Sequence, residues 1–599
     1  MFLRSNKRLK DGKEHRYWSV VENKRIAANR TVQKTILYLG EINDTEKAGW
    51  TRAIQALDEN SQPFQINLFP ADRTPDPTLA HHSIQLRLEG IELSRPRQWG
   101  GCWLALELWD RLRLDDFWQP LLPDSHKGTP WLKVLKTLVV YRLLAPGSEW
   151  HLHTSWFDRS AMADLLDDNF RLAAKDTLYR CHDRLLDHKA ALFTHLKERW
   201  AGLFNATYDI LLYDLTSTYF EVDANGPVAE ASRLKAFGYS RDKRPGCLQI
   251  VIALIITPDG LPIGYEVMRG NTSDKTTLRE TLRKITDQYG KEGRTWIMDR
   301  GIPTEEVLGE MRAADPTVRY LVGTPKGRLT KLEKQLAQKD WQDVKDNVHV
   351  KLLPHENELY LLARSLPRRA KERAMRRKKL GNYWKRLKEL QARPSLSRDE
   401  LLLAIGAAKQ KAGRNAHRLI AIALPANNQP VTPETFRFHL DKAKLKATRR
   451  HEGQYLLRSN LTGENPAELW RNYMNLVRIE ESFRTLKGDL GLRPIHHQLD
   501  HRIEAHILIS FLAYCLHVTL EKINKKAATG LSARSVLARF SEIQMLDVEI
   551  PATDGRTLRM KRHTKPEKIH QLLLDQLGIT LPAQPPPEIS WHPFVVETF

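Results

Sequence analysis

The N-terminal residues alternate in the manner of a small β-sheet. Residues Tyr17–Glu22 and Thr31–Leu39 are rich in β-branched and aromatic side chains, and a basic turn separates them. These two runs predict a β-rich unit over residues 1–60. The next segment, residues 61–95, is rich in proline and polar residues and is typical of a linker.

A helical period replaces this alternation over residues 96–205. Apolar residues recur there at three- and four-residue spacing, which is typical of amphipathic helices. The clearest stretches are Leu104–Leu112, Trp131–Leu144 and Leu178–Phe204. We therefore expect residues 96–205 to form a helical region.

Residues 206–325 carry short apolar runs separated by helical patterns. Tyr208–Leu215 and Gln249–Thr257 predict strands, and the turn at Pro258–Gly260 predicts that Leu261–Val267 returns as a hairpin. The remaining expected elements are a helix over Asp274–Gln288, a strand over Trp296–Met298, a helix over Thr304–Ala313 and a strand over Tyr320–Gly323. This order indicates an α/β core.

The rest of the chain divides into three segments. Residues 326–454 break the α/β rhythm and predict an insertion with its own β structure and one long basic helix. Residues 455–525 return to a helical pattern, from Pro466 to about Leu520, and predict the second part of the core. Residues 526–599 predict a C-terminal basic and helical tail.

Charge narrows the range of functions. The 599 residues hold 94 Lys and Arg against 72 Asp and Glu, a net charge of +22, which favours a polyanionic partner. The longest apolar runs, Ile250–Thr257 and Ile507–Leu520, are shorter than a membrane span. Four widely spaced cysteines and an N-terminus without an apolar stretch favour the reducing cytoplasm. We expect no membrane and no small-molecule substrate.

Two aspartates end apolar strands. Asp214 follows Tyr208–Tyr213, and Asp299 follows Trp296–Met298. Open α/β sheets bind ligands at such strand ends. Two carboxylates on neighbouring strands repel each other unless a cation lies between them, and Mg²⁺ prefers oxygen ligands. Taken singly, each aspartate is more often a turn former or a helix cap.

A third acid comes from a helical stretch. Tyr473, Glu480 and Lys487 recur every seven residues, which places them on one stripe of a continuous helix. Glu480 then faces the metal, and Lys487 lies about 10 Å further along, within reach of a phosphate. Glu481 points about 100° away and is the weaker candidate. The plain alternative for Glu480 is an ion pair with Arg484, four residues on.

Four sequence blocks together resemble a known family. They are YDLTSTYFE, the stretch from GYSRDKRPGC to GNTSDKTTL, IMDRG, and YMNLVRIEESFRTLKGDLGLRPIHH. In this order they are similar to the DDE transposases of bacterial insertion sequences, in the insertion sequence 4 superfamily and its 1634-like group. The resemblance is strong over residues 208–324 and 454–520.

The resemblance implies a fold and a catalytic site. The fold is an RNase H-like, retroviral integrase-like core of the α/β class, interrupted by an inserted domain. Asp214, Asp299 and Glu480 match the metal-binding acids of the family, which imply two Mg²⁺ ions, with Mn²⁺ as a substitute. The Tyr-Arg-Glu-Lys signature falls on Tyr473, Leu476, Glu480 and Lys487, so the expected Arg is absent, and Arg478 or Arg484 is left to contact phosphate.

The implied reaction is DNA transposition. Water attacks a phosphodiester at the element end, and the freed 3′-OH then attacks target DNA in line. The implied partners are double-stranded DNA, as terminal inverted repeats and as target, and a second copy of the chain in a homodimeric synaptic complex. The implied location is the cytoplasm of a bacterium, in association with the nucleoid. We expect residues 96–205 to bind DNA and an element within roughly the first 200 residues to read the repeats.

A basic helix is the second DNA-binding candidate. Residues 367–393 hold twelve Lys and Arg against two acids, more than solubility requires, although such a run is often only a solvated face. Its central candidates are Arg376, Arg377, Lys378 and Lys379. Trp341 and Trp384 also lie in the insertion and are candidates for stacking on a base, with packing as the more common role.

Two polar stretches have a structural interpretation. The loop Gly270–Asp274 is interpreted as a turn and helix cap, in which Ser273 or Asp274 accepts from free backbone N–H groups, rather than as a polar loop near the active centre. His496 and His497 are interpreted as loop residues rather than metal ligands, because no third ligand lies at suitable spacing.

Two other functions remain open on the sequence alone. One is a DNA-binding regulator or decayed copy that has lost catalysis. The other is a nuclease or resolvase on the same core, which cuts DNA without joining ends.

Overall fold

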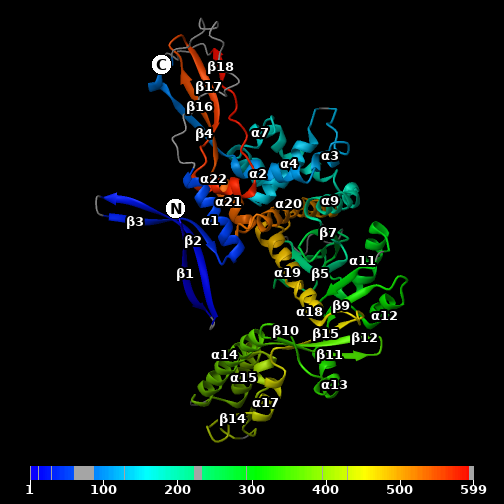
Figure 1. The fold of residues 1–599 in the computed structure, drawn as a ribbon. Helices are drawn as coiled ribbons and strands as arrows, with labels where there is room; N and C mark the ends of the chain where they lie inside the picture. The colour runs from blue at the N-terminus through cyan, green and yellow to red at the C-terminus, as the bar shows by residue number, and fades with distance from the viewer. Residues whose placement is uncertain are drawn as a thin grey trace.

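The protein is described by a computed structural model that covers residues 2–591, apart from 11–12, 28–29, 60–85, 127, 222–231, 292, 394–395 and 428. The chain forms an elongated molecule with a small sheet at one end, helices in the middle and a second helical lobe at the other end (Figure 1). A large central sheet lies between them, with Asp214 on one of its strands, Asp299 directly after another, and Glu480 on a helix that packs on it.

The N-terminal unit is a three-stranded antiparallel sheet. It consists of β1 (Phe2–Lys10), β2 (Lys13–Ala27) and β3 (Arg30–Gly40), in the order β1-β2-β3. Helix α1 (Asp44–Glu59) follows and packs on α22 (Lys568–Leu577) near the C-terminus. Trp50 is fully buried there and donates its indole N–H to the Thr529 carbonyl. Most of the expected linker, residues 60–85, lies outside the described residues.

The helical region has the expected period. Its main helices are α2 (Gly100–Arg111), α3 (Leu114–Trp118), α4 (Trp131–Leu144), α8 (Lys175–His182) and α9 (Lys189–Phe204). Shorter helices between them are α5 (Glu149–His151), α6 (Phe157–Arg159) and α7 (Met162–Leu165). Helix α4 packs directly on the long C-terminal helix α20 (Asp500–Lys526).

A nine-stranded sheet forms the centre of the molecule. Its order is β10 (Gln342–Lys345), β11 (Val348–His355), β12 (Glu358–Ser365), β15 (Gln454–Ser459), β9 (Arg319–Gly323), β8 (Thr295–Met298), β5 (Ile210–Tyr219), β6 (Gln249–Ile256) and β7 (Pro262–Arg269). Strands β5, β8 and β9 run parallel, and all other neighbours are antiparallel. The predicted α/β core is therefore present.

Both faces of this sheet are covered. Leu211 and Tyr213 point to one face, where they pack with α11 (Asp274–Tyr289) and α12 (Glu305–Ala313). Leu212 points to the other face and belongs to the large core that includes α19 (Leu476–Arg484) and α20. The alternation of β5 thus assigns each of its side chains to one of two packed layers.

The insertion shares this sheet, which differs from the expectation of a separate β structure. Strand β12 pairs with β15 over six residues, and β15 pairs with β9 of the core. The edge of β15 would expose unpaired backbone groups without β12, so pairing extends the core sheet. The helical lobe beyond it holds α14 (Leu366–Gln391), α15 (Arg398–Ala412), α16 (Arg414–His417) and α17 (Lys442–Arg450), with a small sheet of β13 (Ile420–Ala423) and β14 (Arg437–Leu440).

The helical stretch expected from Pro466 to Leu520 is interrupted. It consists of α18 (Pro466–Met474), α19, a π-helical turn (Thr485–Asp489), a loop and α20. Helix α20 is long and apolar enough to cross a membrane, yet 94% of its apolar window is buried inside the protein. Its burial identifies it as a core helix of this fold.

The C-terminal segment, predicted to be a basic and helical tail, contains helices α21 (Ala533–Phe540) and α22 and also three strands. The strands β16 (Gln544–Pro551), β17 (Arg556–His563) and β18 (Glu588–Trp591) form a sheet with β4 (Glu92–Gln98). Strand β4 is an edge strand that joins residues 92–95, expected to be linker, to residues 96–98, expected to be helical. A buried ion pair network fixes this pairing, since Arg97 contacts Asp164 at 2.8 Å and Asp547 at 2.6 Å. Strands β4 and β16 lie more than 400 residues apart in the sequence, so no local sequence pattern could predict that they pair.

The burial of α20 leads to a stability prediction. Leu512→Ala should destabilise the protein by about 2–5 kcal/mol, because Leu512 is fully buried and its loss leaves a cavity. Thermal melting monitored by circular dichroism should show a lower transition temperature. Leu403→Ala, at a position that is 76% exposed, is the matched control and should change it little. Equal effects of the two substitutions would contradict the core assignment.

Candidate active site

The register of two parallel strands brings two aspartates together. Tyr213 on β5 is level with Met298 on β8, and these are the last paired residues of the two strands. The next residues are Asp214 and Asp299, so the carboxylates lie at neighbouring positions on the sheet. The sequence placed Asp214 at the end of its strand. In the structure, β5 continues to Tyr219 because it still pairs with β6, and only its pairing with β8 ends.

The pKa of Asp214 is raised to about 7, mainly by burial and in smaller part by the negative charges of Asp299 and Asp274, while a backbone N–H and Arg241 oppose the rise. Asp299 is exposed, and its carboxylate accepts from the Arg300 backbone N–H at 2.7 Å. The pair therefore combines one half-buried acid with one acid open to solvent.

Glu480 lies on the helix that covers this face of the sheet. Asp214 points to the same face as Leu212, where Ile479 and Phe483 of α19 belong to the same apolar core. Helix α19 packs on β5, and the Glu480 side chain is exposed. In the part of the chain that the structure describes, the three acids do not form a converged set of metal ligands. The fold thus brings the two aspartates together and leaves Glu480 on the neighbouring helix.

Tyr473 lies beside Asp299. Burial raises the pKa of Tyr473, and the charge of Asp299 raises it further. The ring stacks on Tyr455 with centroids 6.3 Å apart, and its hydroxyl lies close to Gly323 at the end of β9. A Cβ at position 323 would lie 2.6 Å from that oxygen, so glycine is required for this approach. The tyrosine is held in place by packing at the edge of the acidic pair.

The continuous stripe expected for Tyr473, Glu480 and Lys487 is not present. Helix α18 ends at Met474, and a π-helical turn begins at Thr485, so the helical phase changes twice between these residues. Lys487 is buried and contacts Asp242 at 2.9 Å instead of projecting beside Glu480. The ion pair opposes the effect of burial, which lowers the pKa of Lys487.

The exposure of three residues near Glu480 is consistent with their chemical types. Leu476, where the family signature has Arg, is partly buried and packs on the large core, so an apolar residue fits this environment. Arg484 is exposed on α19. Arg478 is also exposed and pairs with Glu481 at 3.0 Å, which engages the second acid of the Glu480–Glu481 pair in a surface contact.

The loop that carries Arg241 and Asp242 contacts several segments around the acidic pair, and the sequence did not predict these contacts. Arg241 contacts Asp274 at 2.5 Å and its charge acts on Asp214, and the next residue, Asp242, accepts from Lys487 and contacts Arg493 at 2.5 Å. The basic and acidic residues of SRDKRPG could have suggested such a role, but their partners are distant in sequence.

The side-chain cap expected in the loop Gly270–Asp274 is not formed. Ser273 is the N-cap residue of α11 but makes no side-chain cap hydrogen bond. The Asp274 carboxylate pairs with Arg241 instead, and its charge acts on Asp214.

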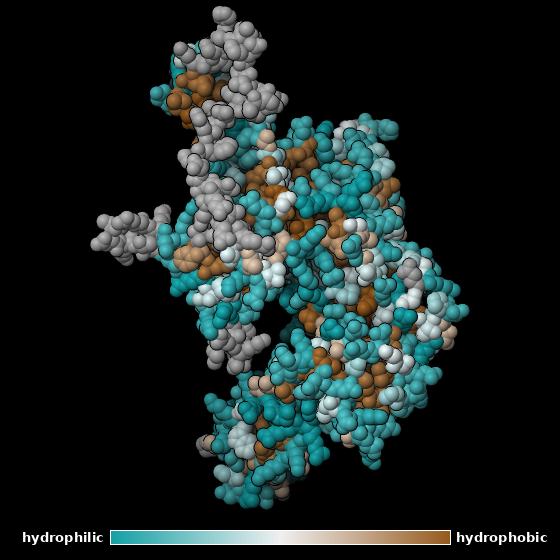
Figure 2. Space-filling view, viewed as in Figure 1, coloured by the Kyte–Doolittle hydropathy of each residue, from teal (hydrophilic) through white to brown (hydrophobic). Residues whose placement is uncertain are grey.

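The basic helix α14 divides its candidates into two groups. Arg376 is buried and pairs with Glu452 at 2.8 Å, so it supports the fold of the insertion. Arg377, Lys378 and Lys379 are exposed. The lobe that carries them is mostly hydrophilic on the face seen in Figure 2.

A hollow of about 500 Å³ lies on the same helix. Its lining combines cationic residues with an aromatic ring and aliphatic carbon, namely Arg377, Leu380, Gly381, Trp384, Lys385, Lys388 and Leu440. Trp384 also packs edge-on against Phe438. The other tryptophan of the insertion, Trp341, lies beneath the Arg364 guanidinium at 4.2 Å, which is a packing role.

Comparisons with known proteins agree with this arrangement. Residues 209–516 match the family model described as a transposase DDE domain, and residues 3–66 match the N-terminal domain of IS1634 family transposases. Among solved structures, the chain is similar to one titled "Cryo-EM structure of piggyBac transposase synaptic complex with hairpin DNA (SNHP)", with 8% identity, a TM-score of 0.37, and coverage of 73% of this chain and 79% of that chain. No curated protein matches.

The raised pKa of Asp214 leads to a pH prediction. In metal-free protein, the protonated carboxyl stabilises the fold fully below about pH 4, and this contribution is lost as the pH rises through about 7. Asp214→Asn stays neutral at every pH. Its free energy of unfolding should equal that of the wild type near pH 4 and exceed it by up to about 4 kcal/mol above pH 7.

Melting temperatures in EDTA from pH 4 to pH 8 measure this difference. Asp209→Asn, at an exposed position on the same segment, is the control and should show no such trend. A difference between Asp214→Asn and wild type that does not vary with pH would show that the Asp214 carboxyl titrates normally.

Proposed function

The chain belongs to the DDE transposase family and is a DNA transposase, and we propose that it cuts DNA at the terminal inverted repeats of its own insertion sequence and joins the ends to target DNA. The family model spans just over half of the chain and includes the whole acidic site. The observation that carries the proposal is the Asp214–Asp299 pair on adjacent parallel strands. Glu480 on the covering helix completes the proposed catalytic set.

Strand order supports an RNase H-like core. The strands run β7-β6-β5-β8-β9, with an antiparallel three-stranded part joined to three parallel strands through β5. Asp214 lies on this shared strand, and Asp299 ends its parallel neighbour. The insertion between β9 and α19 separates the two parts of the core, as the family resemblance implies.

The acidic pair fits divalent cations. DDE transposases are metal-dependent, and the carboxyl group of Asp214 is kept protonated up to about pH 7 by burial and by its acidic neighbours. A divalent cation removes that penalty and prefers such oxygen ligands. We propose that Asp214, Asp299 and Glu480 hold two Mg²⁺ ions, for which Mn²⁺ can substitute. The bound ions would activate the attacking oxygen and stabilise the leaving one.

The residues around the pair position the reacting DNA. Asp214 and Asp299 set one end of the site through the strand register, and Tyr473 closes it beside Asp299 by packing. The charge of Arg241 lowers the pKa of Asp214, so Arg241 is the proposed contact to a phosphate oxygen at this site. Catalysis then rests on orientation and on charge stabilisation rather than on a protein base.

Lys487 acts in this proposal through Asp242. The buried Lys487–Asp242 contact ties the segment after α19 to the loop that carries Arg241. A direct phosphate contact by Lys487 would require that ion pair to open. Arg484 is exposed one turn beyond Glu480 and is the proposed phosphate contact of this helix.

DNA backbone contact is proposed for the exposed face of α14. Arg377, Lys378 and Lys379 are accessible there, and phosphate contacts of this kind add affinity without sequence choice. Reading of the terminal repeats is proposed for residues 96–205. Because two element ends are joined in one event, the proposed working form is a homodimer.

Catalysis should depend on all three acids. Asp214→Asn, Asp299→Asn and Glu480→Gln should each lower cleavage and strand transfer at least about 100-fold, because each loses a metal ligand that stabilises the transition state by several kcal/mol. The assay uses DNA that carries the flanking ends of the gene, target plasmid, and Mg²⁺, Mn²⁺ or EDTA.

Glu481→Gln is the matched control. It removes the neighbouring carboxylate, which pairs with Arg478, and should keep near wild-type activity. Loss of activity in Glu481→Gln with retention in Glu480→Gln would exchange the two assignments. Binding of the ends without cutting in either metal would favour the decayed or regulatory alternative, and cutting that ignores the ends would favour a nuclease.

Affinity for DNA should depend on the exposed face of α14. Lys378→Ala/Lys379→Ala should weaken binding to any duplex and reduce the slope of log affinity against log salt concentration by about 2, because each lysine neutralises about one phosphate. Lys525→Ala/Lys526→Ala removes the same charge from the exposed end of α20 and is the control. An equal loss of affinity in both double variants would indicate a net-charge effect and not an interface.

A further inference from the structure

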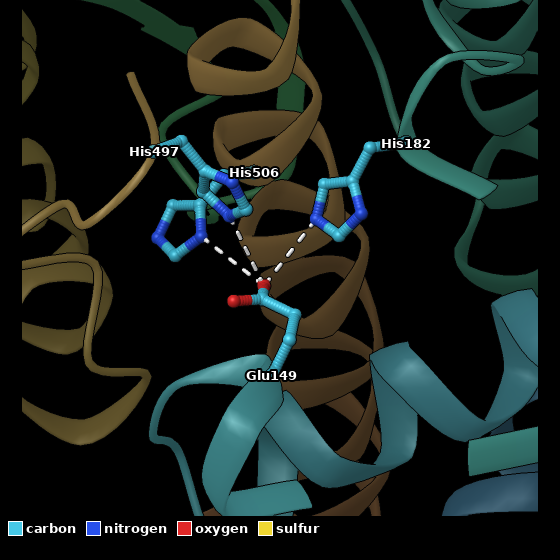
Figure 3. A group of neighbouring side chains, drawn as sticks. All are labelled: Glu149, His182, His497 and His506. Carbon is cyan, nitrogen blue, oxygen red and sulfur yellow. Dashed lines mark hydrogen bonds and ion pairs between the residues drawn. The ribbon is translucent and has the colours of Figure 1, made fainter. Parts of the chain in front are cut away.

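Four buried side chains from distant parts of the chain converge away from the acidic pair. They are Glu149 of α5, His182 of α8, His497 in the loop before α20, and His506 of α20. Their ligand atoms all lie within 4.8 Å of one another (Figure 3). In the part of the chain that the structure describes, this is the one such group of metal-ligand residues.

The distances resemble those in a tetrahedral metal site. Glu149 Oε1 lies 3.2 Å from His497 Nε2, 3.3 Å from His182 Nε2 and 3.7 Å from His506 Nδ1. With metal–nitrogen and metal–oxygen bonds of about 2.0–2.1 Å, the edges of a tetrahedron are about 3.3 Å. The three nitrogen–oxygen edges are therefore close to the required size. The wider nitrogen pairs need only small side-chain rotations.

The tautomer of His182 favours a cation. Its Nδ1 lies 3.0 Å from the Leu178 carbonyl oxygen, which can only accept, so Nδ1 carries the hydrogen. In the neutral ring, Nε2 then has a lone pair and cannot donate to the nearby carboxylate. Nε2 is buried and makes no hydrogen bond. A lone pair and a carboxylate oxygen that face each other at 3.3 Å are stabilised by a cation between them.

Hydrogen bonds alone satisfy this group poorly. Three ring nitrogens face the same oxygen of Glu149, and the Arg142 guanidinium lies 3.6 Å from it as well. Buried polar groups are rarely left poorly paired, and His506 Nδ1, which faces the same carboxylate, has only a long contact of 3.4 Å with Nη2 of Arg142. Without a metal, the contact between His182 Nε2 and Glu149 has a lone pair on each side and needs an extra proton on one of the two groups.

We propose that Glu149, His182, His497 and His506 bind one Zn²⁺ or similar transition-metal ion. Three imidazole nitrogens and one carboxylate suit zinc and not Mg²⁺, which takes oxygen ligands. All four side chains are buried and fill four positions, which is typical of a structural site. This inference does not depend on the proposed reaction.

The ion would join two regions of the chain. Glu149 and His182 come from the helical region before the sheet, and His497 and His506 come from the segment after the catalytic helix. Sequence spacing could not show this site. His497 is in a loop, as the sequence predicted, but its partners lie hundreds of residues away or on the next helix.

Metal analysis of the full-length protein tests the site. The Asp214→Asn/Asp299→Asn variant serves as background, so that the acidic pair does not contribute bound metal. After dialysis against metal-free buffer, we expect inductively coupled plasma mass spectrometry to detect about one Zn²⁺ per chain. Reconstitution with Co²⁺ should give the visible absorption bands of a tetrahedral site, and Mg²⁺ should not displace the zinc.

Substitutions locate the ion. His182→Ala and His506→Ala in that background should each lose the zinc and the cobalt bands, while His496→Ala, at the exposed neighbour of His497, should keep both. Folded background protein that takes up neither zinc nor cobalt would overturn the proposal and establish the metal-free ion pair. That result does not depend on the folding of the histidine variants, and it does not bear on the proposed reaction at the acidic pair.

Discussion

The burial of Asp214 close to Asp299 is the main electrostatic constraint at the centre of the sheet. The parallel register of β5 and β8 places the two residues at neighbouring backbone positions. Asp274 adds a third negative charge, and Arg241 is the compensating cation among the strongest influences on Asp214. The fold tolerates this cost because the two apolar cores on either face of the sheet stabilise β5 on both sides. The two apolar cores stabilise the fold, whereas the buried carboxyl group of Asp214 lowers stability locally.

Long helix α20 connects that site to the rest of the molecule. It is buried along most of its length, packs on α4 of the helical region, and bonds to the core through Tyr514, whose hydroxyl contacts Ser482 of α19 at 2.6 Å. The segment that carries Glu480 is thus fastened to α20 on one side and to β5 on the other. Packing in this layer therefore sets the position of α19.

The sequence predicted those parts of the fold whose signals are local. Strands β5 and β6 and helix α11 lie within a few residues of their expected bounds, since their apolar runs and turn residues are self-contained. Strand β4 was missed, because its partners are more than 400 residues away, and the extension of the core sheet into the insertion was missed for the same reason. Pairing between distant segments is decided by tertiary packing rather than by propensity.

The sequence predicted the two aspartates of the candidate site but not all of the residues that surround them. Asp214 and Asp299 followed from strand ends, and their proximity is confirmed by the register. The stripe that was to place Lys487 beside Glu480 assumed one unbroken helix, and the π-helical turn invalidates it. Arg241 and Asp242 were not predicted, because the sequence of a loop does not show which distant side chains the loop contacts.

The unbroken sheet from β5 to β12 has a mechanical consequence. Helix α14 begins immediately after β12, with Ser365 as its N-cap, and β12 is hydrogen-bonded through β15 and β9 to β8, the strand directly before Asp299. In the proposed complex, DNA bound by α14 and the two carboxylates would therefore contact one continuous sheet. The strands between them would set the distance from the contact with α14 to the site of cleavage. A change in strand register would alter that distance, whereas a longer surface loop would not.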